Sequence, residues 1–420
     1  MILTDCDRAL LSGERGPAAR MAMSILTRMG EIQGAAELLD ITQAHIDSTI
    51  YMGEAGLEFA ERLASFGAKV AVPTSLNVSG LDECHWREWP EVPEDWAGKA
   101  QRQMRAYQGM GCVPMWTCAP YQTNMAPKFG QQIAWGESNA IVFANSVIGA
   151  RTERYPDLLD ICAAITGRVP AVGLHLTENR AGQLLLRLHQ VPRRVQQDDT
   201  FYPVLGLLLG RLAGNRIPVL DGLEVQPTED RLKALGAAAA SSGAVALFHI
   251  VGVTPEAPTL EAAFQGRTPS EVHTVTMDQL RQTRRELTTA PDAKLDMVVL
   301  GSPHFSIAEF RQLAPLVQGK RRHPGVRFLV TTSRIMSALA AQEGILASIE
   351  AFGVQITVDT CILATPMLPK SVKVLMTNSA KYAYYAPGLL STQMVFGSMA
   401  DCVESAVEGR VVRGESLWEK

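Results

Sequence analysis

Three cysteines stand where a thiolate could bind a metal ion. Cys118 and Cys361 each end a short apolar run, in VPMWTC and VQITVDTC, and Cys402 follows FGSMAD near the start of a predicted helix. Main-chain N–H groups at such ends lower the pKa of a thiol and suit metal binding. Separate burial of three unrelated cysteines, the commoner fate of this residue, explains the same positions. Spacing alone therefore leaves both interpretations open.

Polar residues gather at other predicted strand ends, and the carboxyl ends of strands are where α/β folds bind ligands. The candidate substrate-binding residues are Asn77, Ser138, Asn145, Ser146, Arg151, His175, Arg180 and Asn378. The candidate catalytic residues are Ser48, Glu137 and Lys381. Among these side chains the two arginines and the lysine are suited to pairing with a carboxylate. Each position also has a structural explanation, because asparagine is common in turns and histidines beside apolar strands are commonly core residues.

Several well-known enzyme motifs do not occur in the sequence. There is no GxGxxG, P-loop, GxSxG, HExxH or CxxC pattern. A zinc site built from closely spaced cysteines is therefore weakly supported.

Predicted helices alternate along the chain with apolar, strand-like runs, and the polar residues described above stand at the junctions where these runs end. This alternation predicts an α/β fold. Helical patterns cover 5–29, 54–66, 97–109, 276–287 and 334–351. Strand-like runs include 112–117, PAVGLHL, DMVVLGSPHFS, VRFLVTTS, VQITVDTC and VKVLMTNS. Polar, turn-rich breaks at 191–204 and 319–325 divide the chain into three predicted lobes, 1–200 with Cys118, 201–325, and 326–420 with Cys361 and Cys402.

Composition is that of a globular protein and limits the classes of partner. The chain has 420 residues, 47% of them hydrophobic, and a net charge of −4 without a long basic run, so we expect no nucleic-acid partner. The segment 234–254 lacks charged residues, but its Ser-Ser-Gly break favours a helix–turn–strand over a membrane span. The absence of an apolar leader and the odd count of seven cysteines predict a cytoplasmic protein with reduced thiols.

The junctions taken together resemble the aconitase X family, a divergent branch of the aconitase superfamily. The matching pieces include LTDCDRALLSGERG, VPTSLNVSGLD, TCAPYQ, FHIVGVTPEAPT, GSPHFS, TNSAKYAYYAPG and FGSMADCVE. The long block FGQQIAWGESNAIVFANSVIGARTER is the most specific of them. The resemblance implies an aconitase-like fold, with several three-layer α/β/α lobes around a central iron–sulfur cleft.

The resemblance also implies a hydro-lyase with an iron–sulfur cluster held by Cys118, Cys361 and Cys402. Ordinary aconitases draw two ligands from one CxxC, which this chain lacks, so the three ligands must come from separate strand or helix ends. Bacterial relatives favour a [2Fe–2S] cluster, with [4Fe–4S] or mononuclear iron as alternatives. Iron with an open coordination position acts as a Lewis acid that helps a hydroxyl leave as water.

In this superfamily the base that removes the substrate proton is a serine on a swivelling domain. The chain has no room for that domain after Cys402, so we expect a separate small subunit that carries it. The substrate implied by bacterial relatives is cis-3-hydroxy-L-proline, which is dehydrated to Δ1-pyrroline-2-carboxylate. The alternatives are a mevalonate 5-phosphate dehydratase and a non-enzymatic iron–sulfur protein.

Overall fold

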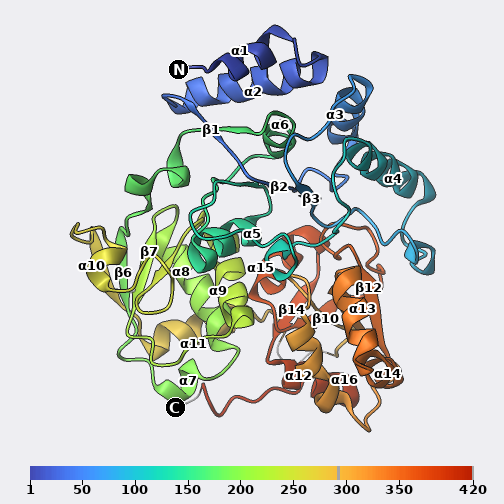
Figure 1. Cartoon of the computed structure of the whole chain (residues 1–420). Helices are drawn as coiled ribbons and strands as arrows, with labels where there is room; N and C mark the ends of the chain where they lie inside the picture. Colours follow the sequence, from blue (N-terminus) through green and yellow to red (C-terminus); the bar gives the residue numbers. More distant parts are fainter. Residues whose placement is uncertain (291–293, 419–420) are drawn as a thin grey trace. The chain divides into compact units, whose positions relative to one another are not determined.

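The computed structural model describes residues 1–290 and 294–418 (Figure 1). The chain forms two compact units, Met1–Ala181 and Gly182–Lys420. Both contain helices and parallel strands, so the predicted α/β class is confirmed. No single helix within the described ranges is long and apolar enough to cross a membrane. The helices α13 (Arg334–Gln342) and α14 (Ile345–Phe352) meet that criterion only when joined across a 103° bend.

The first unit is built on short strands. Parallel strands lie in the order β3-β2-β4, and β1 pairs with β5 in the antiparallel sense. The strands are β1 (Leu38–Asp40), β2 (Ala44–Ile46), β3 (Thr74–Leu76), β4 (Ala134–Trp135) and β5 (Arg168–Pro170). The longer helices are α1 (Asp5–Ser12), α2 (Pro17–Gln33), α3 (Glu54–Ser65), α4 (Glu94–Gly109), α5 (Ser138–Phe143) and α6 (Leu159–Thr166). Short 3₁₀ turns η1 (Trp86–Glu88), η2 (Pro120–Gln122), η4 (Gly173–His175) and η5 (Thr177–Arg180) and the π-helix η3 (Ala144–Ile148) complete the unit.

The second unit begins with a parallel sheet of order β8-β7-β6-β9. Its strands are β6 (Leu184–Arg187), β7 (Pro218–Asp221), β8 (His249–Ile250) and β9 (Glu271–Thr274). The helices between and after them are α7 (Arg193–Gln196), α8 (Phe201–Ala213), α9 (Glu229–Ser242), α10 (Leu260–Ala263) and α11 (Met277–Glu286).

Helices α8 and α9 lie side by side and approach closely because small residues line their contact (Figure 1). A β-carbon on Gly206 would lie 2.2 Å from the carbonyl oxygen of Leu235, so only glycine fits there. The alanines at 237–240 are all buried. The uncharged segment 234–254 is therefore the second half of a tightly packed helix that ends at Ser242, followed by the short strand β8, as the sequence predicted.

A second parallel sheet in this unit has the order β12-β11-β10-β13-β14. Its strands are β10 (Met297–Leu300), β11 (Arg327–Thr332), β12 (Val354–Val358), β13 (Val374–Thr377) and β14 (Gln393–Phe396). The associated helices are α12 (Ile307–Val317), α13 (Arg334–Gln342), α14 (Ile345–Phe352), α15 (Ala380–Leu390) and α16 (Met399–Glu408). The central strands β10 and β13 are buried throughout, as expected for a parallel sheet covered on both faces.

The strand order reverses at β10, and this reversal positions a site. The chain runs outward from β10 to β11 and β12, then returns to place β13 on the other side of β10. The connections after β10 and β13 therefore diverge, which leaves space between their loops at the carboxyl edge of the sheet.

Some predicted elements differ from those observed. The helix expected over 5–29 is interrupted at Gly13, which ends α1 in a left-handed conformation. The strand expected at 112–117 is absent from the described secondary structure except for one bridge between Val113 and Ser75. Pro114, which has no N–H to donate, explains that loss. PAVGLHL enters 3₁₀ turns after β5 ends at Pro170.

The predicted lobe boundaries fall inside sheets. A boundary at 200/201 would separate β6 from its partners β7 and β9. A boundary at 325/326 would separate β10 from β11, which pair directly. Polar, turn-rich loops mark both places, but such loops also connect strands within one sheet.

Candidate functional site

Carboxylates gather at the carboxyl edge of the three-stranded sheet in the first unit. Asp47 follows β2, Asn77 follows β3 and Glu137 follows β4. The Asn77 amide nitrogen donates a hydrogen bond to the Asp47 carboxylate. A β-carbon on Gly136 would lie 2.8 Å from Cβ of Asp47 and 2.9 Å from Oδ2 of Asp160, so a glycine lets these acids approach.

Burial gives these acids unusual proton affinities. The pKa of Asp47 is raised well above its ordinary value by burial and by the negative charges of Glu137, Asp157 and Asp160. Burial also raises the pKa of Asp160 to about 6, although hydrogen bonds from Ser48 oppose the rise. Ser48 donates its hydroxyl to Asp160 and accepts from the backbone N–H of Leu158 at 2.8 Å. Both shifts favour the protonated form of a carboxyl group at this edge.

Cys118 is tied to the same edge through Asn139. The Asn139 side-chain nitrogen donates to the carbonyl oxygen of Cys118 at 2.7 Å and also to the Glu137 carboxylate. Glu137 in turn caps α5 by accepting from the backbone N–H of Ala140 at 2.8 Å, and it receives the hydroxyl of Ser138 at 3.3 Å. The structure thus brings together the predicted residues Ser48, Asn77, Glu137, Ser138 and Cys118.

Another group of predicted residues surrounds the π-helix η3 and makes mainly internal contacts. Arg180 is fully buried, and its guanidinium donates to the carbonyl oxygens of Leu174, Asn145 and Ala150 at 2.8, 3.0 and 3.2 Å. The Asn145 side chain also bonds both backbone groups of Thr152. These hydrogen bonds give Arg180 and Asn145 a structural role, and their contact with substrate stays a prediction.

His175 shares this interior position. Its Nδ1 lies 2.6 Å from Oε1 of Gln132, and its Nε2 is hydrogen bonded to the hydroxyl of Tyr155. Burial, with the positive charges of Arg180 and Arg151, lowers the pKa of His175 to about 3. The ring is therefore neutral at physiological pH. Arg151 is half-buried and donates to Thr177 at 2.7 Å, and Ser146 is buried in η3.

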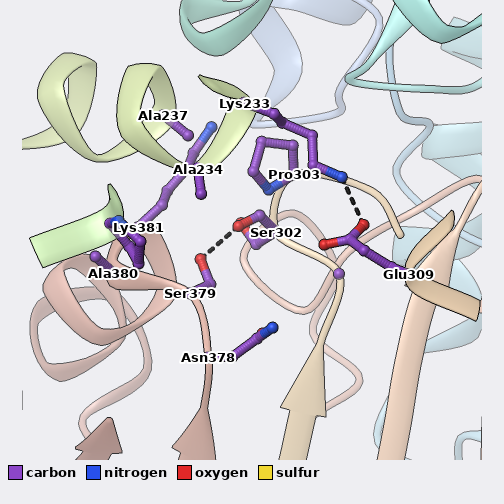
Figure 2. Close-up of a pocket in the computed structure, with 12 residues that line it drawn as sticks. Lys233, Ala234, Ala237, Ser302, Pro303, Glu309, Asn378, Ser379, Ala380 and Lys381 are labelled. Atoms are coloured by element: carbon purple, nitrogen blue, oxygen red, sulfur yellow. Dashed lines mark hydrogen bonds and ion pairs between the residues drawn. The ribbon is translucent and has the colours of Figure 1, made fainter. Parts of the chain in front are cut away.

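In the second unit a small pocket of about 40 Å³ lies at the strand reversal between β10 and β13. It is lined by Ser302 and Pro303 from the loop after β10, by Asn378 and Ser379 from the loop after β13, and by Lys381 from the first turn of α15 (Figure 2). The Ser379 hydroxyl donates to the carbonyl oxygen of Ser302, which closes one side. The predicted residues Asn378 and Lys381 therefore share a pocket.

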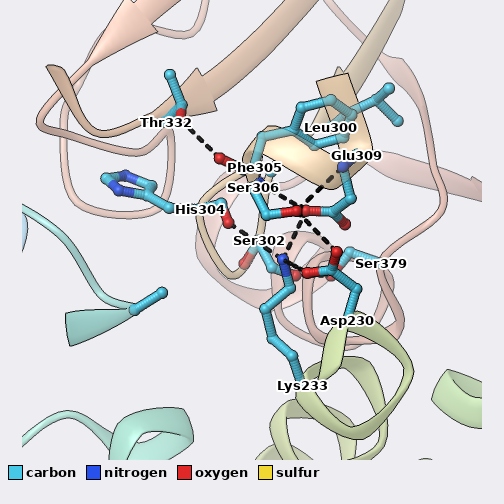
Figure 3. A network of polar contacts seen from close by, with 12 residues as sticks. Asp230, Lys233, Leu300, Ser302, His304, Phe305, Ser306, Glu309, Thr332 and Ser379 are labelled. Atoms are coloured by element: carbon cyan, nitrogen blue, oxygen red, sulfur yellow. Dashed lines mark hydrogen bonds and ion pairs between the residues drawn. The ribbon is translucent and has the colours of Figure 1, made fainter. Parts of the chain in front are cut away.

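A buried ion cluster supports the wall of this pocket (Figure 3). The ammonium of Lys233 lies 2.7 Å from Oδ1 of Asp230 and 2.5 Å from Oε2 of Glu309, and the Ser306 hydroxyl donates to Asp230 at 2.7 Å. Burial alone would lower the pKa of Lys233, but Glu309 and Asp230 outweigh it and raise that pKa. Burial raises the pKa of Glu309 to about 7, although Lys233 opposes the rise.

Hydrogen bonds connect the wall of this pocket to the residue before Cys361. Lys233 donates to the carbonyl oxygen of His304 at 3.3 Å, and Nε2 of His304 lies 3.0 Å from the carbonyl oxygen of Thr360, which precedes Cys361. Burial lowers the pKa of His304 to about 4, so the neutral ring donates through Nε2. Cys361 is partly exposed at the carboxyl edge of the sheet.

Cys402 differs from the other two predicted ligands. It lies on the first turns of α16, is fully buried, and belongs to the hydrophobic core of the five-stranded sheet. Burial and the nearby Asp401 raise the pKa of its thiol well above the ordinary value. Its surroundings are those of a core cysteine, whereas Cys118 and Cys361 lie at sheet edges beside polar groups.

The three-cysteine site stays a prediction. Cys118 belongs to the first unit and the other two cysteines to the second. No preformed group of three or more metal-ligating side chains was found among residues 1–290 and 294–418. Two residues before Cys118 and before Cys361, Trp116 and Asp359 adopt left-handed backbone with φ of 45° and 67°. Such conformations are costly for non-glycine residues and tend to cluster at functional sites.

The sequence analysis did not identify Asp47, Lys233 or Glu309 as candidate site residues. Asp47 directly precedes the predicted Ser48 and follows β2, so its place after a strand was the available signal. Lys233 lies in an alanine-rich helix, where the spacing of three residues to Asp230 was the only indication of a pair. Glu309 stands three residues after Ser306, which is the spacing of a helix capping box.

Comparison with known proteins matches each part of the chain to a domain of one protein family. Residues 1–178, 182–285 and 295–408 match models of the first, second and third domains of aconitase X. A cis-3-hydroxy-L-proline dehydratase of Pseudomonas aeruginosa is 49% identical over 98% of this chain and 71% of its own length. A protein of the same name from Hypocrea jecorina is 47% identical over 97% of this chain and 69% of its length.

More distant relatives carry a different name. The phosphomevalonate dehydratase large subunit of Methanothermobacter thermautotrophicus is 36% identical over 93% of this chain and 95% of its length. The crystal structure of Thermococcus kodakaraensis aconitase X in its holo form has a TM-score of 0.86 and 32% identity, covering 97% of this chain and all of that one. On the strength of these matches, which extend over nearly all of its length, the chain belongs to the aconitase X family.

Proposed function

We propose that this protein is a hydro-lyase that dehydrates cis-3-hydroxy-L-proline to Δ1-pyrroline-2-carboxylate. The observation that carries the proposal is the 49% and 47% identity to two dehydratases of that substrate. The phosphomevalonate dehydratase large subunits reach 34–36% over similar stretches of this chain. The buried acids and the pocket at the strand reversal give the chain groups suited to such a reaction.

We propose Cys118, Cys361 and Cys402 as ligands of an iron–sulfur cluster within an aconitase-like fold, with [2Fe–2S] as the favoured form. The name of the solved relative, a holo form, supports a bound cofactor in the family. Such a cluster would supply a Lewis acid for the departing hydroxyl. The sheet-edge positions of Cys118 and Cys361 suit ligation. Cys402 has the weakest support of the three, because its thiol is packed in the core.

Asp47 is our candidate for the group that protonates the departing hydroxyl. Burial and neighbouring negative charges raise its pKa, which favours the protonated acid, and Asn77 orients it by a hydrogen bond. In the dehydration, the carbon–oxygen bond at C3 breaks, and the hydroxyl accepts that proton and leaves as water. The α-proton at C2 passes to a separate base, and the electrons of its bond form a C2=C3 double bond. The resulting enamine loses its N–H proton and gains a proton at C3, which gives Δ1-pyrroline-2-carboxylate.

We propose that this separate base is a serine on a small swivelling subunit. The relatives named large subunits support a two-part enzyme, since the chain spans 95% and 100% of two of them. Co-expression of this chain with a candidate small subunit should give a stable complex and raise activity far above that of the chain alone. Full activity of the isolated chain would contradict the two-subunit proposal.

The decisive assay for the function is turnover of cis-3-hydroxy-L-proline against mevalonate 5-phosphate by anaerobically purified protein. We expect water loss from the first and none from the second. The reverse preference would refute the proposed substrate, and iron binding without either activity would favour a non-enzymatic iron–sulfur protein.

Iron content tests the ligands separately from activity. Cys361→Ser should remove most bound iron, whereas Cys84→Ser, which changes an exposed cysteine, should leave iron unchanged. Cys402→Ala distinguishes two roles: loss of iron identifies a ligand, and retained iron with lower stability identifies a core residue. Wild-type protein that is active without bound iron would rule out the cluster.

A further inference from the structure

The turn that follows β2 carries Asp47, the candidate proton donor, and it is held from two sides. The turn comprises residues 47–50, and the backbone N–H of Ile50 donates to the carbonyl oxygen of Asp47 at 3.3 Å. Ser48 and Thr49 are buried, whereas Asp47 keeps some exposed surface. Asp47 is therefore the acid of this turn that a substrate can reach, and its placement depends on what holds its neighbours.

Asp160, in the first turn of α6, binds the donor groups of the turn. Its Oδ2 accepts the backbone N–H groups of Asp47 and Ser48 at 2.7 and 3.2 Å. Its Oδ1 accepts the hydroxyl of Ser48 and the backbone N–H of Ile161, the latter at 2.7 Å. Four hydrogen bonds fill the accepting capacity of an ionised carboxylate. An asparagine offers only one accepting oxygen, so this position requires an acid.

Asp160 has no surface with which to contact a substrate, because its side chain is fully buried. The chain after β4 covers it, since a β-carbon on Gly136 would lie 2.9 Å from Oδ2 of Asp160. Any effect of Asp160 on the reaction must therefore pass through the residues that it binds.

Gln103, a fully buried residue of α4, holds the same turn through its carbonyl groups. Its side-chain nitrogen donates to the carbonyl oxygens of Ser48 and Ile50 at 2.7 and 3.1 Å. The Ser48 hydroxyl also accepts from the backbone N–H of Leu158 at 2.8 Å. Ser48 is thus bound at its N–H and hydroxyl by α6 and the residue before it, and at its carbonyl by α4.

We propose that Asp160 and Gln103 are positioning residues, which hold the turn 47–50 so that Asp47 meets the departing hydroxyl in a fixed orientation. The inference rests on the proposed function, because Asp47 is the proton donor of that reaction. Displacing a catalytic group by about 1 Å can cost about 10²-fold in rate. Loss of either support should therefore lower kcat and leave KM nearly unchanged.

Amide hydrogen exchange of the full-length chain tests the support without turnover. In Asp160→Asn, exchange of peptides covering 45–51 should rise at least about tenfold, because hydrogen bonds to a charged acceptor are lost. Asp296→Asn is the matched control. Asp296 also accepts two backbone N–H groups, from Lys373 and Val374 at 2.9 and 3.0 Å, but it precedes β10 in the other unit. Its substitution should leave exchange at 45–51 unchanged.

Steady-state kinetics in the presence of the small subunit tests the consequence for the reaction. Asp160→Asn and Gln103→Met should each lower kcat about tenfold or more with little change in KM. Asp296→Asn should keep the wild-type kcat. Iron content should stay at the wild-type value in all three variants, because none of them changes a proposed cysteine ligand. This result would separate a misplaced acid from a lost cluster.

The two variants differ in charge, which gives a readout that a purely structural role would not move. Burial raises the pKa of Asp47, and three neighbouring carboxylates raise it further: Glu137, Asp157 and Asp160. The hydrogen bond from Asn77 opposes the rise. Because a proton donor acts only while protonated, kcat falls as pH rises through its pKa. Asp160→Asn should move this fall to lower pH, whereas Gln103→Met removes no charge and should leave it in place.

Wild-type exchange at 45–51 in Asp160→Asn would overturn the inference, as would a wild-type kcat in Gln103→Met, which tests the turn even if Asp160→Asn does not fold. An unmoved pH profile in a folded Asp160→Asn would also contradict it. Absence of turnover by the wild-type complex would instead refute the proposed function, and the exchange rates would still decide whether Asp160 holds the turn.

Discussion

The ion cluster of Asp230, Lys233 and Glu309 predicts how the stability of the second unit changes with pH. Burial raises the pKa of Glu309 from an ordinary 4.5 to about 7. Between these values the folded protein holds a proton that the unfolded chain has lost. The free energy of unfolding therefore falls as pH rises through this window. Each pKa unit corresponds to about 1.4 kcal/mol, so 2.5 units correspond to about 3 kcal/mol.

Glu309→Gln should remove this pH dependence, because glutamine keeps the shape of the protonated acid and has no proton to lose. Relative to the wild type, the variant should gain about 2–3 kcal/mol of stability between pH 5 and pH 8. The side chain is only 15% exposed, so solvent screens little of the effect. Hydrogen exchange of peptides from α9 and α12, measured across this pH range, reports the local stability.

The control is Glu343→Gln. Glu343 forms an exposed pair with Arg311 at 2.6 Å, and hydrogen bonding from Arg311 lowers the pKa of Glu343. Its substitution should give a small effect with the opposite dependence on pH, because an acid with a lowered pKa loses its stabilising effect as pH falls. Parallel pH curves for the wild type and Glu309→Gln would show that Glu309 is not buried as an acid of raised pKa.

Three further predictions concern packing and buried charge. Lys233→Met should destabilise the second unit by about 3–5 kcal/mol in urea unfolding, because it leaves buried carboxylates without their cation. Lys320→Met is the control: it removes a lysine from an exposed ion pair and should cost under about 1 kcal/mol. Arg180→Met should lower the thermal stability of the first unit by several degrees because buried carbonyl groups lose their donor; intact stability with a raised KM would instead favour a contact with substrate. Gly136→Ala should cost about 1–3 kcal/mol, because a methyl group would lie within 3 Å of buried neighbours, while Gly98→Ala, with open space around it, should cost nothing in the same melting assay.

The sequence could predict where polar groups stand but not what they contact. Asn378 and Lys381 follow a recognisable strand, and the parallel sheet brings them to one edge with Ser302. Arg180 has the same local appearance, yet its partners are the carbonyl oxygens around a π-helix. A π-helix leaves no regular pattern in the sequence, so the internal role of Arg180 could not be predicted from it.

The pairing of buried charged residues was the other feature that could not be predicted from the sequence. Lys233 lies among alanines in a helix whose neighbour carries glycines, and this close packing is what buries it. The acids that balance it include Glu309, 76 residues away. Pairs of this kind depend on the assembled fold, whereas the α/β class depends on local alternation of helices and strands and was predictable.

The strand reversal also determines when the pocket can form during folding. The hydrogen bond that joins Ser379 to Ser302 spans 77 residues, and the contact of Lys233 with His304 spans 71. Closing such long loops is slow compared with the formation of single helices. Most helical signal should therefore appear before the pocket exists, and ligand binding should be among the last properties recovered on refolding.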